Sequence, residues 1–341
     1  MSRVASVLLF LFAVAPLATG ADWPQWRGQD RSNHCTETGL LQEWPTDGPP
    51  LLWKAEGIGQ GVPSVSVSQG KIFVLGYRDG LEYLTALSEK DGSRIWSTAM
   101  GSEVKEQPAM RWLSQRTPTV DGDRVYAFTA RGELICAATA DGKEKWRKDY
   151  VKDFGGKPGT WGYCDYPLVD GERLIVTPGA KGAAMVALDK KTGEAVWKCP
   201  VAGASRGTYG AVVAAEIAGT RQYVHQLEAG VIGVDAKDGK LLWHYSGFGS
   251  TTGNPHTALV RGDEVFASCG FGVGIALLRI KKDGDMFKFE EVYRNKTAFD
   301  PWLASSVRLG EYVHSANGVC VEWKTGRQVA EPGGCRRAGS R

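Results

Sequence analysis

The sequence predicts an all-β fold, a β-propeller of about six four-stranded blades between residues 54 and 329. Three observations predict it: a hairpin motif that recurs at nearly constant spacing, a strand-turn-strand motif upstream of each hairpin, and no helical periodicity after residue 21. The chain has 341 residues, of which 43% are hydrophobic, so it can bury a large core. Its 44 glycines and 12 tryptophans suit many short strands joined by tight turns.

The hairpin motif consists of an apolar strand end, a polar turn, a glycine, three residues and a tryptophan. Successive tryptophans lie 50, 51 and 46 residues apart. Asp189 and Asp235 can hold their turns by accepting hydrogen bonds from backbone N–H groups two residues further on. The glycines supply the positive φ that a short hairpin needs, and we expect each indole to pack between adjacent sheets. The four copies are Gly92 with Trp96, Gly142 with Trp146, Gly193 with Trp197, and Gly239 with Trp243.

The stretch upstream of each hairpin repeats as well. Residues 118–128 and 167–176 each suggest a short strand, an Asp-Gly turn and a second strand, so one unit holds four strands. We place the first four blades at about 54–96, 97–146, 147–197 and 198–243. The fifth has an irregular hairpin that passes Gly284 and reaches Tyr293. The sixth holds Ala330 where a tryptophan is expected, four residues after Gly326.

The first 21 residues predict a signal peptide with cleavage before Asp22. Arg3 gives a positive start, and residues 4–18 are apolar apart from Ser6. A membrane anchor is the alternative, but this run is shorter than the roughly 20 residues that span a bilayer. No cysteine sits at the junction, so we expect no lipid anchor. The mature protein is expected to have no membrane span and to be periplasmic or secreted.

Charge and cysteines exclude some functions. The net charge is +3 with no run of five like charges, so no nucleic-acid partner is expected. The seven cysteines form no C-x-x-C pair and fit no zinc spacing. Cys136, Cys269 and Cys320 sit in strand-like runs and are interpreted as buried small hydrophobic residues. One or two disulfides remain open.

The hairpin resembles the PQQ repeat of quinoprotein dehydrogenases, which also occurs in exported BamB-like bacterial proteins. The segment from Asp22 to Gly28, Asp-Trp-Pro-Gln-Trp-Arg-Gly, looks like the opening of such proteins, and the resemblance covers about residues 22–329. It implies that eight blades close the ring and that residues 22–53 help to complete the last blade. About two blades would then be missing at the C-terminus, which would leave strand edges exposed. Closure with six or seven blades is the alternative.

The resemblance leaves the activity open. A catalytic quinoprotein would hold PQQ between a tryptophan and a disulfide of two adjacent cysteines, with Ca²⁺ on Glu, Asn and Asp and an Asp as base. This sequence has no Cys-Cys pair, so we expect a non-catalytic binding or scaffold module without cofactor, catalytic residue or metal ligand. The alternatives are a PQQ- and Ca²⁺-dependent alcohol or sugar dehydrogenase, degenerate or not, and a non-functional fragment of a longer gene.

Polar and aromatic residues gather where one blade passes to the next. They either satisfy the loops between blades or form a central pocket for an aromatic ligand, a sugar-like ligand or an extended peptide. The candidates for the channel face are Arg116, Trp161, Tyr163, Asp165, Arg206, Tyr209 and His256. Arg111, Trp112, Asn254 and Trp302 belong to the same group.

The chain from residue 330 to 341 departs from the family pattern, and residues 331–341 show no strand pattern. They are interpreted as a foreign or misread tail, with a natural disordered tail as the alternative. If the tail is misread, the nucleotide sequence beyond the codon for Val329 should resume the hairpin-and-tryptophan pattern in another frame. Translation of all frames tests this, and a pattern found in none of them would favour the natural tail.

Overall fold

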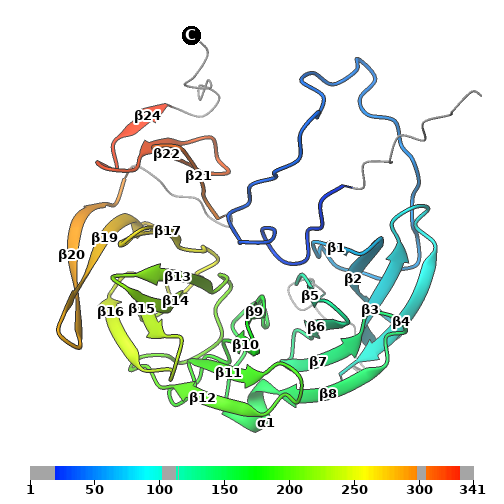
Figure 1. Cartoon of the computed structure of the whole chain (residues 1–341), viewed down its shortest axis with the longest axis horizontal. Coiled ribbons are helices and arrows are strands. Elements are labelled where there is room, and N and C mark those ends of the chain that lie inside the picture. Colours follow the sequence, from blue (N-terminus) through cyan, green and yellow to red (C-terminus); the bar gives the residue numbers. More distant parts are fainter. Residues whose placement is uncertain (1–19, 102–112, 114, 298–304, 331–341) are drawn as a thin grey trace, which may run out of the picture.

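The computed structural model describes residues 20–101, 113, 115–297 and 305–330, and folds them into six four-stranded antiparallel sheets. The sheets follow one another in chain order around an arc, with the first strand of each toward the centre and the fourth at the periphery (Figure 1). The predicted all-β architecture of about six four-stranded blades is therefore confirmed. The predicted signal peptide up to residue 19, the tail from 331, and Arg111, Trp112 and Trp302 lie outside the described residues.

Each sheet is a meander of four consecutive strands, and we number the sheets 1 to 6 in chain order. Sheet 1 holds β1 (Ser66–Ser68), β2 (Lys71–Arg78), β3 (Leu81–Ser88) and β4 (Arg94–Met100). Sheet 2 holds β5 (Thr119–Asp121), β6 (Arg124–Phe128), β7 (Glu133–Ala138) and β8 (Glu144–Asp149). Sheet 3 holds β9 (Leu168–Asp170), β10 (Arg173–Val176), β11 (Met185–Asp189) and β12 (Ala195–Cys199).

The other three sheets repeat this order. Sheet 4 holds β13 (Val213–Ile217), β14 (Thr220–Leu227), β15 (Gly230–Asp235) and β16 (Leu241–Ser246). Sheet 5 holds β17 (Leu259–Arg261), β18 (Glu264–Cys269), β19 (Gly274–Asp283) and β20 (Met286–Asn295). Sheet 6 holds β21 (Val307–Leu309), β22 (Tyr312–His314), β23 (Cys320–Glu322) and β24 (Gln328–Ala330). One short helix, α1 (Tyr150–Phe154), follows β8.

The third and fourth strands of every sheet share one irregularity. The pairing of these two strands shifts register directly after the third-strand residue that faces the aromatic position of the fourth strand. In sheets 1 to 4 that third-strand residue is small. A small residue leaves room for the indole against the third strand. The facing pairs in these sheets are Ala86 with Trp96, Cys136 with Trp146, Ala187 with Trp197, and Gly233 with Trp243.

The aromatic ring of one sheet lies against the hairpin glycine of the next sheet. A Cβ placed on Gly142 would come within 2.5 Å of the Trp96 ring, so only glycine fits there. The indole N–H of Trp96 also donates to the carbonyl of Thr139 at 3.1 Å, three residues before Gly142. We call this arrangement the ring-on-glycine contact. It recurs with Trp146 on Gly193, Trp197 on Gly239, and Tyr293 on Gly326.

Trp197 lies on Gly239 but lacks the hydrogen bond, and Trp243 does not lie on a glycine of the next sheet. The indole N–H of Trp197 has no hydrogen-bond partner, and the carbonyl of Ala236, three residues before Gly239, accepts from Arg173. Trp243 turns back onto Gly233 of its own sheet and donates to Gln222 Oε1 at 2.7 Å. Gly284, the turn glycine of sheet 5, carries no ring, because a Cβ there would meet nothing within 4 Å. The β19–β20 ladder extends to the Asp283–Met286 pair beside this turn.

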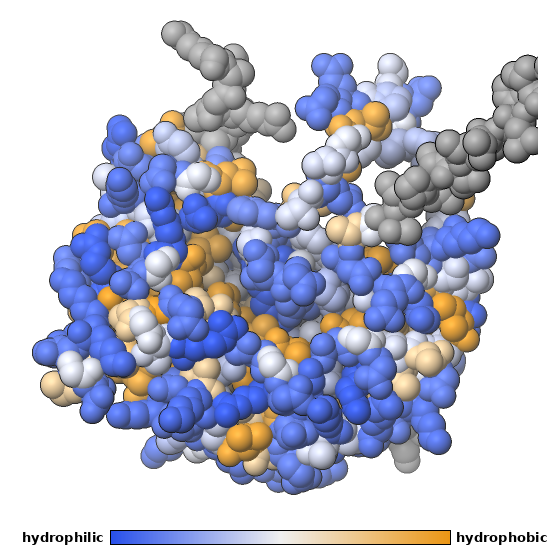
Figure 2. All heavy atoms as spheres, viewed as in Figure 1, coloured by the Kyte–Doolittle hydropathy of each residue, from blue (hydrophilic) through white to orange (hydrophobic). Residues whose placement is uncertain are grey.

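Five apolar clusters fill the spaces between neighbouring sheets. In one cluster, Phe73 and Leu84 of sheet 1 lie with Val125 and Ile135 of sheet 2. The other four clusters join sheets 2 and 3, 3 and 4, 4 and 5, and 5 and 6. The six cysteines in the described part of the chain are all free, and all but Cys35 are buried. Polar residues cover most of the face in Figure 2. No helix within the described ranges is long and apolar enough to cross a membrane.

The ring-on-glycine contact predicts unequal effects at two glycines of sheet 2. Gly142 and Gly122 both have positive φ, +71° and +56°, but a Cβ on Gly122 would meet nothing within 4 Å. An alanine at either site costs about 1–2 kcal/mol of backbone strain. Gly142→Ala should cost about 1–3 kcal/mol more, because the Trp96 ring must move. Urea denaturation followed by tryptophan fluorescence checks this, and equal losses at both sites would contradict it.

Candidate functional site

The N-terminal segment, residues 22–34, crosses the inner ends of the sheets. Trp23 forms an isolated bridge with Val67 of sheet 1, and the carbonyl of Pro24 accepts a hydrogen bond from Val120 N of sheet 2 at 2.8 Å. His34 lies 2.7 Å from the carbonyl oxygen of Arg308 in sheet 6. This segment therefore connects sheets that are far apart in the sequence (Figure 1).

Two buried arginines fix the segment at the centre. Arg31 donates to the carbonyls of Pro167 at 2.6 Å and Val212 at 2.9 Å, just before β9 and β13. Arg27 donates to the carbonyl of Ser306 at 2.8 Å, just before β21. Burial lowers the pKa of each arginine to about 10, and the charge of Asp165 opposes this shift at Arg31. Both guanidinium groups thus stay charged at neutral pH and satisfy buried carbonyl groups.

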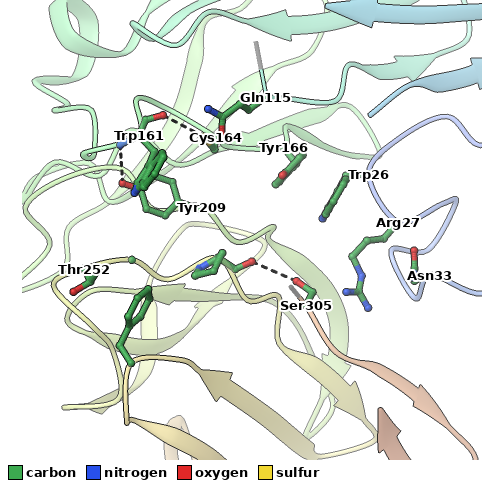
Figure 3. Close-up of a pocket in the computed structure, with 13 residues that line it drawn as sticks. Trp26, Arg27, Asn33, Gln115, Trp161, Cys164, Tyr166, Tyr209, Thr252 and Ser305 are labelled. Carbon is green, nitrogen blue, oxygen red and sulfur yellow. Dashed lines mark hydrogen bonds between the residues drawn. The ribbon is translucent and has the colours of Figure 1, made fainter. Parts of the chain in front are cut away.

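A pocket of about 410 Å³ opens beside this segment (Figure 3). Its walls come from the N-terminal segment, from the loops that lead into sheets 2 to 6, and from the turn after β18. The residues that line it are Trp26, Arg27, Asn33, Gln115, Trp161, Cys164, Tyr166, Tyr209, Thr252, Gly253, Pro255, Phe271 and Ser305.

Aromatic rings form much of the pocket wall. Trp26 stacks on Tyr166 with ring centroids 4.5 Å apart and an interplanar angle of 12°. Tyr209 accepts a hydrogen bond on its hydroxyl from the backbone N–H of Trp161 at 3.2 Å, which holds the two loops together. The side chains of Trp161 and Phe271 stay 45% and 37% exposed. The pocket thus offers aromatic surface that a bound molecule can cover.

The pocket has few groups suited to acid–base work. Among the described residues that line it, none is a carboxylate, and its one charged side chain, Arg27, is bound to the carbonyls of Arg31 and Ser306. Burial raises the pKa of the Cys164 thiol to about 11, so this thiol stays protonated at neutral pH. These walls fit an apolar, aromatic or sugar-like group better than a charged one.

Comparison with known proteins assigns the family. Residues 82–284 match the family model described as outer membrane protein assembly factor BamB. The chain belongs to this family. A protein named outer membrane protein assembly factor BamB, from Xanthomonas campestris pv. campestris, is 26% identical over 153 residues. The match covers 42% of this chain and 36% of that relative, so it spans well under half of the relative's length.

Solved structures share the fold of this BamB-family chain. BamB from Moraxella catarrhalis is 20% identical with a TM-score of 0.59, covering 82% of this chain and 76% of its own. A europium-containing methanol dehydrogenase is 12% identical with a TM-score of 0.56, covering 78% of this chain and 68% of its own. The quinohemoprotein alcohol dehydrogenase from Comamonas testosteroni is 16% identical with a TM-score of 0.51, covering 79% and 58%. At these identities the likeness concerns the fold alone.

Three of the channel-face candidates lie at or beside the pocket. Trp161 and Tyr209 line it. Arg206 lines a small adjoining depression, which Tyr209 shares, and pairs with Glu228 at 2.8 Å while donating to the carbonyl of Thr251 at 2.7 Å. Its guanidinium group therefore shapes the rim near the pocket in this BamB-family chain.

The other four candidates are buried behind the pocket and do not line it. Arg116 pairs with Glu82 at 2.5 Å, and Tyr163 donates to the carbonyl of Pro178 at 3.2 Å. Asp165 accepts from the backbone N–H groups of Tyr166 and Thr177, and burial raises its pKa. His256 is fully buried in the loop that leads into sheet 5, as is Asn254. Arg116, Tyr163 and Asp165 thus bind groups in the loops between sheets and do not form the pocket wall.

Sequence reasoning missed several residues of the site. Trp26 belongs to the opening segment that carries the family resemblance, but nothing in the sequence places that segment beside sheet 3. Tyr166 follows Asp165 directly in the sequence. Tyr166 lines the pocket, whereas the side chain of Asp165 is buried and does not line it. Phe271, at φ +60° in the turn between β18 and β19, carries no sequence signal of a site.

The described residues do not fit the PQQ and Ca²⁺ site that the resemblance implies for a dehydrogenase. Such a site needs an acidic ligand set for Ca²⁺ and a disulfide of adjacent cysteines. Across residues 20–101, 113, 115–297 and 305–330, no group of three or more His, Cys, Asp or Glu side chains could hold a metal ion. The described lining of the pocket also contains no carboxylate, so it offers Ca²⁺ no anionic ligand.

Arg31 predicts a large stability effect from one side chain at the centre. Arg31→Gln should lower the free energy of unfolding by roughly 2–4 kcal/mol, because it leaves buried carbonyls without their charged donor. Arg261→Gln removes an exposed ion pair with Glu311 and should change little. Urea denaturation and protease sensitivity of residues 22–34 measure both. Equal behaviour of the two variants would contradict a fixing role for Arg31.

Proposed function

We propose that this protein is an extracytoplasmic, non-catalytic binding scaffold that acts in the assembly of outer membrane proteins. The observation that carries the proposal is the central pocket, whose walls are largely aromatic. The described residues that line it include no carboxylate. Membership of the family described as outer membrane protein assembly factor BamB supports the biological setting. The apolar N-terminal run with Arg3 supports export.

The pocket is proposed to receive an apolar or aromatic side chain from a partner protein. Trp161 and Phe271 are partly exposed around a space large enough for such a group. Buried aromatic anchors in pockets carry most of the binding energy at many protein interfaces. The polar groups of Asn33, Gln115 and Thr252 on the wall suit the main chain that would carry such an anchor.

Site-directed photo-crosslinking tests the pocket as a protein contact. A photoreactive phenylalanine at position 271 should crosslink to an outer membrane protein or an assembly protein in cells, and Trp161→Ala should reduce the yield at least several-fold. The matched control is the same probe at Met286, which is 61% exposed at the β19–β20 turn. Crosslinks that are equal at both sites, or insensitive to Trp161→Ala, would contradict the proposal.

A cofactor assay separates the scaffold from a PQQ-dependent alcohol or sugar dehydrogenase. The purified protein should give no PQQ-dependent dye reduction with alcohols or sugars after incubation with PQQ and Ca²⁺, because the described pocket offers Ca²⁺ no carboxylate. PQQ absorbance after gel filtration shows separately whether the quinone binds. Dye reduction that requires PQQ would reverse the order of the two functions.

A further inference from the structure

One side of the central pocket carries three hydrogen-bond donors without an acceptor. Arg27 uses Nε and Nη2 for the carbonyls of Arg31 and Ser306, which leaves its Nη1 group with no acceptor among the described residues. The indole N–H of Trp26 and the hydroxyl of Tyr166 also make no hydrogen bond within the ranges that the structure describes. None of these three atoms is sealed from solvent, and all three residues line the pocket. A bound molecule can therefore reach all three donors.

The charge of Arg27 is not balanced by an ion pair in the described part of the chain. Its side chain is 4% exposed, and both of its acceptors are neutral carbonyl oxygens. The acidic group that acts on it, Asp30, is exposed, and the pKa of about 10 keeps the guanidinium charged at neutral pH. A buried guanidinium is most stable when a carboxylate accepts from it. Most of the pocket wall suits an apolar group, but this corner suits a carboxylate.

Aromatic rings form the opposite side of the pocket. Figure 3 shows Trp161 and Tyr209 on the side away from Arg27, while Trp26 lies between Tyr166 and Arg27. The hydrogen bond from the backbone N–H of Trp161 to the Tyr209 hydroxyl holds these two rings together. A molecule that fills the pocket therefore meets hydrogen-bond donors at one end and aromatic faces at the other.

We infer that the pocket binds the C-terminal residue of a partner polypeptide that ends in an aromatic side chain. This inference rests on the proposed function and narrows it from any aromatic side chain to one at a chain end. The terminal carboxylate accepts from Arg27, Trp26 and Tyr166, and the ring lies against Trp161 and Tyr209. Capture of a terminal carboxylate is a recurring way to recognise peptides. An internal aromatic residue would instead bring a neutral amide, whose N–H would face these donors.

The same chemistry, a ring joined to a carboxylate, is found in free aromatic acids. A chain end is favoured because Asn33 and Thr252 are exposed on the pocket wall, where their side chains can bind the main chain before the last residue. A sugar fits this corner less well, because its hydroxyl groups also donate, and the free groups of Arg27 and Trp26 only donate. The positive charge of Arg27 repels a cationic group.

Labelled peptides test the inference on the full chain. The first probe is a fluorescent peptide, Ser-Gly-Ser-Gly-Ser-Phe, with a free terminal carboxylate, and fluorescence polarisation should show that it binds saturably. The same peptide with a terminal carboxamide should bind about 10-fold more weakly, because it loses the charge that pairs with Arg27. A peptide that ends in alanine should also bind about 10-fold more weakly, because it lacks the ring. Extension by Gly-Ser beyond the phenylalanine should weaken binding to a similar degree.

Variants on the donor side should remove the preference for the carboxylate over the carboxamide. Tyr166→Phe keeps the ring and loses only the hydroxyl, so the ratio of the two affinities should fall several-fold. Arg27→Gln should bind both peptides equally, and circular dichroism checks that it folds without its contact to Ser306. Tyr166→Phe keeps the test valid if Arg27→Gln does not fold. Tyr223→Phe, which loses a hydroxyl bound to Asp170 outside the pocket, is the matched control and should keep the wild-type preference.

Several outcomes would overturn the inference. Equal affinity for carboxylate and carboxamide, a preference that survives both donor-side variants, or no binding of any peptide would each remove the chain end as the ligand. Displacement of the peptide by free N-acetylphenylalanine or PQQ at the concentration at which unlabelled peptide displaces it would make a free aromatic acid the ligand.

The crosslinking experiment at position 271 separates this failure from failure of the proposed function. If crosslinks that depend on Trp161 persist while the peptides show no preference, the pocket remains a protein contact and only the chain-end inference falls. If the crosslinks are absent as well, both fall.

Discussion

The structure depends on an aromatic ring that lies on a glycine of the next sheet. In its full form the contact combines three features: no Cβ on the glycine, a small residue behind the ring on its own sheet, and a carbonyl three residues before the glycine that accepts a hydrogen bond from the ring. Trp96 and Trp146 meet all three. Tyr293 meets the first and third with its hydroxyl, although Leu277 faces it. Since the ring both fills a gap and donates a hydrogen bond, it fixes the spacing and the angle between successive sheets.

The centre of the arc is held by a different kind of interaction. The innermost strands are short and leave carbonyl groups pointing inward, and two buried arginines satisfy several of these across sheets 3, 4 and 6. Burying a charge is costly unless it is fully hydrogen-bonded, and Arg31 meets this condition with Gln25 as a further partner. The same segment places Trp26 against Tyr166. The segment whose arginines bind the central carbonyl groups therefore also forms one wall of the pocket.

Local patterns account for the fold, while the site depends on packing between distant segments. The glycine-tryptophan spacing predicts the first four sheets because each copy encodes one turn and one wedge, and two irregular hairpins extend the number to six. The irregular fifth hairpin shows in the sequence as the long stretch from Gly284 to Tyr293. The sequence does not reveal that Trp243 folds back on Gly233, because Trp243 has the same spacing from Gly239 as the other three tryptophans have from their glycines. Trp161 and Tyr209 are predictable as aromatic residues of the loops between sheets. Arg116 and Asp165 have the same appearance in the sequence, but burial and local hydrogen bonds decide their role.

The N-terminal chain is anchored to the sheets at two places that lie far apart along it. His34 is held at the carbonyl of Arg308 in sheet 6, and the next anchor is Trp53 at the carbonyl of Glu89 in sheet 1. Residues 35–46 between these anchors are exposed and form no strand. An exposed stretch without backbone pairing transmits little force, because its own conformations absorb a displacement at either end. The pocket wall that Trp26 and Arg27 form is therefore held in place by the two buried arginines and not by the contact of Trp53 with sheet 1.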